Sequence, residues 1–280
     1  MLLIMKNKFL LIFLLSIQCY LYAQTCEELN KAGQDYISSG KFLEAEQVFT
    51  KYISICSDIS QGYSSRGNAR IFLKKFQDAI DDFNKAISID STNFRAYSNR
   101  GTVYVLLQNG ENAEKDFLKA LMIKPDDVTT LNSYSAILYA DGRKREALEM
   151  LDECISIDPA HAESYRTRGS IRLFEKDTLG AVSDLTKAIE LAPNNVNMYN
   201  TRGAIYREME KYNDAIADYN RALKIDPNNA EAYCRRGVSY LYLKEYDKSI
   251  ADIEKGLSIQ PSLEPLVKKY LDEAKEKKGK

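Results

Sequence analysis

The feature that most constrains the fold of this sequence is an internal repeat of constant length. The dipeptide Arg-Gly starts at Arg66, Arg100, Arg168, Arg202 and Arg236, and a frame built on it divides most of the chain into seven equal segments with no insertion or deletion. A fixed period of this size is typical of arrays in which each repeat is one supersecondary unit stacked on its neighbours. The 34-residue segments are 26–59, 60–93, 94–127, 128–161, 162–195, 196–229 and 230–263.

Each repeat carries small residues at two fixed positions and a large one at a third. The eighth residue is Gly except for Ser135 in the fourth repeat, the twentieth is Ala except for Ser249 in the seventh, and the twenty-fourth is a large apolar or aromatic residue. Apolar residues recur at helical spacing on both sides of a short turn, which predicts two antiparallel helices per repeat. The small residues let these helices approach closely, and a Pro at the end of the last five repeats marks where the second helix stops.

The sixth repeat carries the complete motif. It reads Tyr199-x2-Arg202-Gly203-x2-Tyr206, continued by Ala215, Tyr219, Ala222 and Pro227. This motif and its period resemble the tetratricopeptide repeat, and the resemblance covers residues 26–263. It implies an all-α fold, a right-handed α-solenoid of seven helix-turn-helix repeats, with a concave groove lined mainly by the first helix of each pair.

The repeat array therefore occupies residues 24–263, and residues 264–280 follow it. The terminal repeat of such an array needs a cover with a polar outer face. We expect a C-terminal capping helix and tail in this segment, with Leu266, Tyr270 and Ala274 on the stripe that packs against the array.

An arginine and an aspartate vary together within the repeats. Five repeats have Arg at the seventh position and Asp at the twenty-third, whereas the two repeats without the Arg also lack the Asp. We therefore predict structural ion pairs between the two helices of a repeat, in preference to an arginine ladder that binds an acidic polymer. Such pairs can be bidentate, although desolvation offsets part of the attraction. They are Arg66–Asp82, Arg100–Asp116, Arg168–Asp184, Arg202–Asp218 and Arg236–Asp252.

Two cysteines of the first repeat are placed to form a disulfide. Cys26 opens its first helix and Cys56 follows the end of its second helix, and antiparallel helices bring these ends together. An exported protein reaches an oxidising compartment, where disulfides persist. We therefore expect a Cys26–Cys56 disulfide, and we expect Cys154 to be a small core residue.

The segment 1–23 has the organisation of a signal peptide. Two Lys precede a short apolar run, Phe9 to Leu15, and Ala23 stands at the expected cleavage site. The run is too short to span a bilayer, which needs about 20 apolar residues. We expect export and cleavage, no integral membrane span afterwards, and a location in the periplasm or at the cell surface of a Gram-negative-type bacterium. A lipid anchor at Cys19 and an uncleaved anchor are the alternatives.

Composition narrows the classes of function. Lys and Arg number 39 against 40 Asp and Glu, so the net charge is −1, whereas a nucleic-acid-binding protein normally shows a basic excess. The single His, His161, excludes a multi-His metal site, and no catalytic constellation or Gly-rich phosphate loop is recognisable. We expect a non-enzymatic protein with no metal and no cofactor.

The resemblance places the second, fifth, ninth, twelfth and thirteenth residues of each repeat in the groove. Their mixture of amides, hydroxyls and a few aromatics suits a protein or peptide ligand. The Lys–Asn carboxylate clamp with which some family members hold chaperone C-termini is absent. We predict a protein–protein interaction scaffold of the cell envelope, with a glycan- or peptidoglycan-associated binding module as the alternative. The predicted groove residues are Asn30, Gln34, Asn68, Phe72, Arg95, Leu106, Asn132, Tyr139, Arg166, Phe174, Asn200, Arg207, Leu241 and Tyr242.

Overall fold

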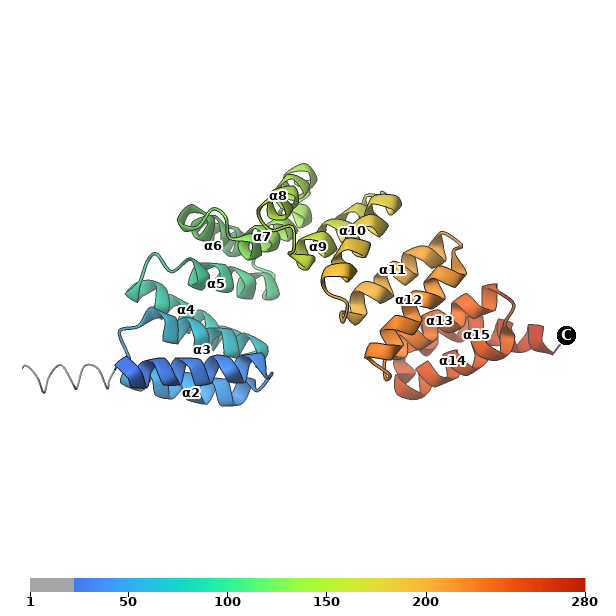
Figure 1. Ribbon diagram of the computed structural model, residues 1–280, viewed down its shortest axis with the longest axis horizontal. Helices are drawn as coiled ribbons and strands as arrows, with labels where there is room; N and C mark the ends of the chain where they lie inside the picture. The colour runs from blue at the N-terminus through green and yellow to red at the C-terminus, as the bar shows by residue number, and fades with distance from the viewer. Residues whose placement is uncertain (1–22, 280) are drawn as a thin grey trace, which may run out of the picture. The chain divides into compact units, whose positions relative to one another are not determined.

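The computed structural model describes residues 23–279, and within this range the regular structure is helical throughout (Figure 1). The described chain divides into two compact units, of which unit 1 ends at Ile137 and unit 2 begins at Leu138. The expected signal sequence as far as residue 22, with Cys19, lies outside the described residues.

Unit 1 contains the first three helix pairs. Residues 23–38 are helical and form the first helix of repeat one. The pairs stack on one another, because α2 packs against α3 and α4 packs against α5. The labelled helices of this unit are α2 (Phe42–Ile55), α3 (Ser60–Phe72), α4 (Phe76–Ile89), α5 (Phe94–Leu106), α6 (Gly110–Ile123) and the part of α7 (Val128–Ala140) that ends at Ile137.

Unit 2 contains the remaining helices, in the same alternation. Helix α8 packs against α9, α10 against α11, and α12 against α13, while α15 packs against both helices of the last pair. The helices after α7 are α8 (Lys144–Ile157), α9 (Ala162–Phe174), α10 (Thr178–Leu191), α11 (Val196–Glu208), α12 (Tyr212–Ile225), α13 (Ala230–Tyr242), α14 (Tyr246–Ile259), the 3-10 turn η1 (Pro261–Leu263) and α15 (Glu264–Lys278).

The turn inside each repeat has one constant backbone geometry. In repeat two, the N–H of Lys74 donates to the carbonyl of Ile71, and the N–H of Lys75 donates to the carbonyl of Arg70, both at 2.9 Å. These bonds satisfy carbonyls that the last helical turn leaves free. The fifteenth residue of every repeat has positive φ for this reason, and these residues are Gly40, Lys74, Gln108, Gly142, Lys176, Glu210 and Lys244.

Close packing explains the glycines at the eighth position. A Cβ atom on Gly67 would lie 2.8 Å from the ring of Phe83, and one on Gly101 would lie 2.9 Å from the ring of Phe117. Both rings are fully buried. The large residue at the twenty-fourth position therefore fills the space that a side chain at the eighth would need.

The arginine and aspartate that vary together form bidentate pairs in all five repeats. In repeat six, Arg202 donates from Nε to Asp218 Oδ2 at 2.9 Å and from Nη2 to Oδ1 at 2.7 Å. The same two bonds join the arginine and aspartate of the other four pairs. Each pair fastens the first helix of a repeat to its second helix.

Each of these arginines also reaches the preceding repeat, which the sequence did not lead us to expect. Nη1 of Arg202 donates to Thr186 Oγ1 at 2.9 Å, and Nη1 of Arg168 donates to Asp152 Oδ1 at 2.5 Å. The acceptor is always the twenty-fifth residue of the preceding repeat. At the junction where the following repeat has no Arg, that position holds Leu118, which cannot accept a hydrogen bond. The other acceptors are Thr50, Asn84 and Asn220.

The first repeat is closed by a disulfide between Cys26 and Cys56, with the two Cα atoms 6.3 Å apart. Both cysteines are buried beside Tyr52 and Ile53. The bridge joins the start of the repeat to its end and closes a loop of about 30 residues. By lowering the entropy of the unfolded chain, it stabilises the fold by roughly 3–4 kcal/mol. Cys154 is fully buried, as expected of a small core residue.

The capping helix α15 forms, but it packs with a different stripe from the one expected. Leu266 is 68% exposed, so its assignment to the packed stripe is wrong. Val267 and Ala274 are buried instead, with Tyr270 and Leu271 packed in the same cluster as Val267 and Ile253. The spacing of three and four residues from Val267 defines the buried face. In residues 23–279, no helix combines the length and the apolar character that a membrane span requires.

Candidate functional site

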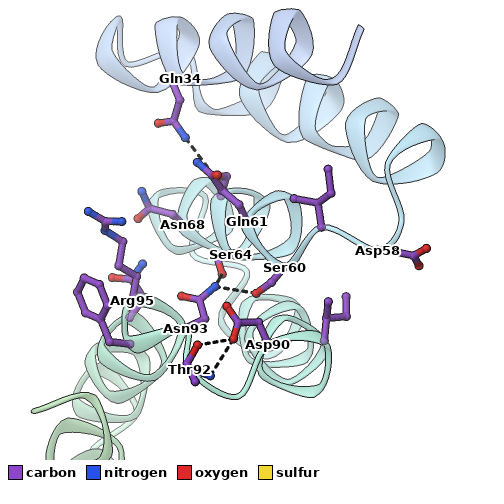
Figure 2. A pocket seen from close by; sticks show the side chains of 15 residues that line it. Gln34, Asp58, Ser60, Gln61, Ser64, Asn68, Asp90, Thr92, Asn93 and Arg95 are labelled. Atoms are coloured by element: carbon purple, nitrogen blue, oxygen red, sulfur yellow. Dashed lines mark hydrogen bonds between the residues drawn. The ribbon is translucent and has the colours of Figure 1, made fainter. Parts of the chain in front are cut away.

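Unit 1 has a wide polar pocket of about 870 Å³ on the face formed by the first helices of repeats one to three. Figure 2 shows its side chains converging from residues 23–38, from α3 and from the start of α5. Amides and hydroxyls predominate in its lining. They include Gln34, Gln61, Ser64, Ser65, Asn68, Asn93 and Asn99.

Helical spacing and one loop residue position these groups. Ser64 and Asn68 are four residues apart and therefore lie on the same face of α3. Asn93 precedes α5, and its Oδ1 accepts from the N–H of Ala96 at 3.0 Å, which fixes the helix start. Its Nδ2 donates to Ser60 Oγ at 2.7 Å and Ser64 Oγ at 3.0 Å (Figure 2). This loop residue thus ties one repeat to the next at the floor of the pocket.

The polar side chains of the pocket differ in whether the described residues offer them a partner. Gln34 donates to Ser65 Oγ at 3.1 Å. Within residues 23–279, the side-chain amides of Gln61, Asn68 and Asn99 make no hydrogen bond. An amide group offers both donors and an acceptor, so these three side chains are free to bind a polar ligand.

Three lining residues of the pocket are charged, namely Asp58, Asp90 and Arg95. The guanidinium of Arg95 lies 5.0 Å from the ring centre of Phe94, and Lys124 Nζ lies 5.1 Å from the same ring. Hydrogen bonds from the side chain and backbone of Thr92 lower the pKa of Asp90, so this carboxylate stays ionised in its turn. The only aromatic ring in the lining of this pocket therefore already has two cations beside it.

The predicted groove residues of unit 1 are not all brought together. Gln34, Asn68 and Arg95 line the polar pocket. Phe72 lies at the turn end of α3, where its ring stacks on Phe42 with centroids 4.3 Å apart. Leu106 is half-exposed at the corresponding end of α5. The amide oxygens of Asn30 and Asn132 are buried and have no hydrogen-bond partner among the described residues.

Unit 2 distributes its predicted residues over several places. Asn200 lines a cavity of about 330 Å³, and Arg207 lines another of about 230 Å³. Arg166 is paired with Glu163 in its own helix. The hydroxyl of Tyr139 donates to Glu175 Oε1 at 3.0 Å.

Three further residues of unit 2 lie at the turn end of their helices. The exposed ring of Phe174 lies 6.3 Å from that of Tyr139, and Tyr242 stacks on Tyr212 at 5.0 Å. Leu241 is only 4% exposed, so its assignment to the groove is wrong. The last turn of α13 directs Tyr242 outward and buries Leu241 in the helix packing.

Sequence reasoning missed the sixth position of the repeat, which supplies Ser65 and Asn99 to the pocket. A signal was present, because this position is polar in all seven repeats. The loop residue Asn93 was also missed. Its role depends on hydrogen bonds to Ser60 and Ser64 of α3, across the boundary between two repeats. The sequence pattern of a single repeat does not reveal them.

Nothing in the described residues groups His, Cys, Asp and Glu side chains as a metal ion would require. The pocket of unit 1 consists mainly of neutral hydrogen-bonding groups, with one guanidinium, that of Arg95, and two carboxylates, those of Asp58 and Asp90. Such a set can bind and orient a polar chain, because each amide can donate and accept at once.

The repeats match known sequence families. Models described as TPR repeat match residues 67–110 and 203–244, and models described as Tetratricopeptide repeat match residues 94–127, 128–161, 185–217 and 230–263. Together these matches cover more than half of the chain. No curated protein sequence matches the chain significantly.

Solved structures show the same fold. The APC/C hetero-tetramer Cut9–Hcn1 gives a TM-score of 0.73 at 16% identity, covering 86% of this chain and 48% of that chain. This chain therefore spans about half the length of that protein. A tetratricopeptide repeat protein from Parabacteroides merdae gives 0.60 at 19% identity, covering 90% and 99%. PilF of Pseudomonas aeruginosa gives 0.63 at 19% identity, covering 79% and 97%.

Likeness at these identities establishes the fold and nothing finer. The 34-residue period, the helix pairs with their constant turn, and the family matches agree with one another. The chain belongs to the tetratricopeptide repeat proteins.

Proposed function

We propose that this protein is a non-enzymatic scaffold of the cell envelope that binds an extended segment of another exported protein. Tetratricopeptide repeats are a protein-interaction fold. The observation that carries the proposal is the polar pocket of unit 1, in which the amides of Gln61, Asn68 and Asn99 make no hydrogen bond to any residue of 23–279. An extended polypeptide presents alternating N–H and C=O groups, and side-chain amides can pair with both.

A glycan ligand, the alternative, has less support. Sugar rings are commonly held by stacking on an open aromatic face beside amides. The ring of Phe94 already has Arg95 and Lys124 over it at 5.0 and 5.1 Å, and a sugar would have to compete with these cations for the ring. The polar lining by itself suits either ligand, and the aromatic geometry favours the polypeptide.

The location in the envelope rests on two features. The segment 1–23 has the charge and apolar pattern of an export signal. The disulfide between Cys26 and Cys56 is of the kind that persists in an oxidising compartment. Amino-terminal sequencing of the protein from fractionated cells tests this part, with Gln24 expected as the first residue in the envelope fraction. A cytosolic protein that retains Met1 would refute it.

Affinity capture with matched variants tests the binding function. We expect the tagged protein to capture a protein partner from envelope extract, and the double variant Asn68→Ala/Asn99→Ala to lose it because two pairs of backbone contacts disappear. The control is Gln77→Ala, which removes an exposed amide of α4 whose one side-chain partner within residues 23–279 is Asp81. Retention of every partner by the double variant would show that the pocket does not bind them. Loss of the bound material after glycan digestion, but not after proteolysis, would favour the glycan.

A further inference from the structure

An apolar cavity of about 230 Å³ lies in unit 2, where α11 and α13 meet the capping helix α15. Val238 of α13 and Val267 of α15 form buried walls, at 2% and 7% exposure. Leu266 also lines this cavity, although it is 68% exposed. An exposed leucine beside an apolar cavity is surface that a bound apolar group would remove from water.

One cation without a partner borders the same cavity. Arg207 of α11 lines it, and its side chain makes no ion pair or hydrogen bond with any other residue in the described range. Arg235 lines it too, but its Nε and Nη2 both bond to Glu231, at 2.9 and 2.5 Å. The cavity therefore has apolar walls and one uncompensated positive charge.

Two arginines, Arg207 and Arg235, line the cavity. Glu231 lines it as well and accepts both hydrogen bonds from Arg235. Since Glu231 neutralises Arg235, the net charge that a ligand meets is that of Arg207.

We propose that this cavity binds the C-terminal residue of a partner protein, with an apolar side chain such as leucine in the cavity and the terminal carboxylate on Arg207. The inference rests on the proposed function, because α11 and α13, which line the cavity, are first helices of their repeats. Guanidinium groups bind carboxylates through charge-assisted hydrogen bonds. The Lys–Asn clamp absent from the sequence involves neither Arg207 nor these apolar walls.

The small size of the cavity favours a terminal residue over an internal acidic one. Successive side chains of an extended chain point to opposite sides, so an acidic neighbour of the buried apolar residue would face away from Arg207. At a C-terminus, the carboxylate and the side chain leave the same Cα atom. Both can then occupy a cavity that holds roughly one large side chain.

Small ligands test the proposal on the intact protein. We expect N-acetyl-leucine to shift the methyl NMR signals of Val238 and Val267 saturably, with a dissociation constant in the millimolar range. N-acetyl-leucinamide lacks the charge and should bind about tenfold more weakly or worse. Octanoate represents a fatty acid, and tighter binding of octanoate than of N-acetyl-leucine would overturn the assignment to a peptide terminus.

Three variants separate the two parts of the cavity. Arg207→Gln should lower the affinity for N-acetyl-leucine to the level of that for N-acetyl-leucinamide. Leu266→Ser should weaken the binding of both ligands. Arg221→Gln is the matched control, because Arg221 is an exposed arginine of α12 without a side-chain partner in the described range, and it should change neither. Unchanged melting temperatures show that the variants fold.

Three results would each overturn the proposal. They are equal affinities for N-acetyl-leucine and N-acetyl-leucinamide, a preference for N-acetyl-leucine that persists in Arg207→Gln, and the absence of a saturable shift of the methyl NMR signals. Its failure can be told apart from failure of the proposed function. If the Asn68→Ala/Asn99→Ala variant still loses its partner, the scaffold function stands and only the terminal-residue site falls. If partner capture is unaffected by either set of variants, both are wrong.

Discussion

At the scale of single residues, the seventh-position arginine joins three helices. Arg202 bonds to Asp218 in its own repeat and to Thr186 in the preceding one. The Arg202 side chain is 15% exposed and that of Asp218 is 6% exposed. Water therefore screens the pair little, and removal of either partner would leave a buried charge without compensation.

Replacing Arg202 with Lys keeps the charge but removes the planar fork that makes two parallel bonds. We expect Arg202→Lys to lower the free energy of unfolding by about 1–3 kcal/mol, measured by urea denaturation. The control is Arg145→Lys, because Arg145 and its partner Glu149 are both largely exposed and exposed pairs contribute little. Equal effects of the two substitutions would contradict the role given to the buried pair.

Glu46 makes unit 1 sensitive to acid. Its side chain is 12% exposed and accepts from Lys75 Nζ at 2.6 Å and Arg70 Nε at 2.9 Å. Burial alone raises the pKa of Glu46, but the hydrogen bonds and charges of Lys75 and Arg70 outweigh it and leave the pKa below the usual 4.5. A carboxylate whose pKa is lower in the folded protein than in the unfolded chain stabilises the fold when the pH is above the unfolded-state pKa. This stabilisation is lost as the pH falls through the folded-state pKa.

We therefore expect Glu46→Gln to be less stable than the unmodified protein at pH 7. The difference should shrink below about pH 4.5, where the unmodified carboxylate becomes protonated. Thermal unfolding followed by circular dichroism between pH 3 and pH 7 measures this. A difference that stays constant over the whole range would mean that protonation of Glu46 is not involved.

The sequence allowed some residue roles to be predicted and not others, for a physical reason. The Arg–Asp pairs could be predicted because both partners belong to one repeat and vary together. The bond to the preceding repeat links the seventh position to the twenty-fifth of another repeat, so covariation within one repeat could not show it. Leu241 was assigned to the groove and is buried, because a small rotation of the last helical turn decides whether it or Tyr242 faces outward.

At the scale of elements, the turn between paired helices depends on one residue with a left-handed backbone. Only Gly40 and Gly142 suit this conformation without strain, and the other five repeats place a side chain there. Lys176, with φ of 65°, is one of them. The strain of a left-handed residue with a Cβ is of order 1 kcal/mol, and the surrounding bonds to the α9 carbonyls hold it in place.

Lys176→Gly should therefore raise the free energy of unfolding, by about 0.5–1 kcal/mol after the entropy of glycine in the unfolded chain is allowed for. Equilibrium denaturation measures the change. Lys176→Ala is the control, because alanine removes the long side chain and keeps the Cβ, and it should bring no gain. A gain with alanine as large as that with glycine would trace the effect to the lysine charge.

The helix pairs themselves could be predicted from sequence, since period and apolar spacing both require them. The face of an element was harder to predict. In α15, Leu266 and Val267 are adjacent and both apolar, and only packing against the cluster around Ile253 selects Val267 as the buried one. The left-handed turn position went unrecognised because five of its seven residues are not glycine.

At the scale of the whole molecule, stability is a sum of contributions from neighbouring repeats. The capping helix α15 covers Cys234, Val238 and Ile253 of the last repeat, through Val267 and Tyr270. Removing residues 264–280 would expose this apolar surface. We expect faster hydrogen exchange in α13 and α14 of the truncated protein and unchanged exchange in α3 and α4. Uniformly faster exchange would mean that the array unfolds as one cooperative body.

The number of repeats and their boundaries could be predicted from the sequence, because a constant spacing of 34 residues without insertions fixes both. The division into two units did not. It falls within repeat four, between Ile137 and Leu138, and this repeat has Tyr134 and Met150 where five others have the Arg–Asp pair. Sequence alone marks this repeat as different without showing that a boundary lies there.

Site-specific photo-crosslinking in living cells is the most direct test of the central claim that the polar pocket of unit 1 binds an extended protein segment. A photoreactive residue at Gln61, which lines the pocket, should give an adduct with a discrete protein, and one at Gln77 on the exposed face of α4 should not. Mass spectrometry of the Gln61 adduct should identify one continuous segment of that partner. No adduct at Gln61, or the same adducts from both positions, would contradict the account.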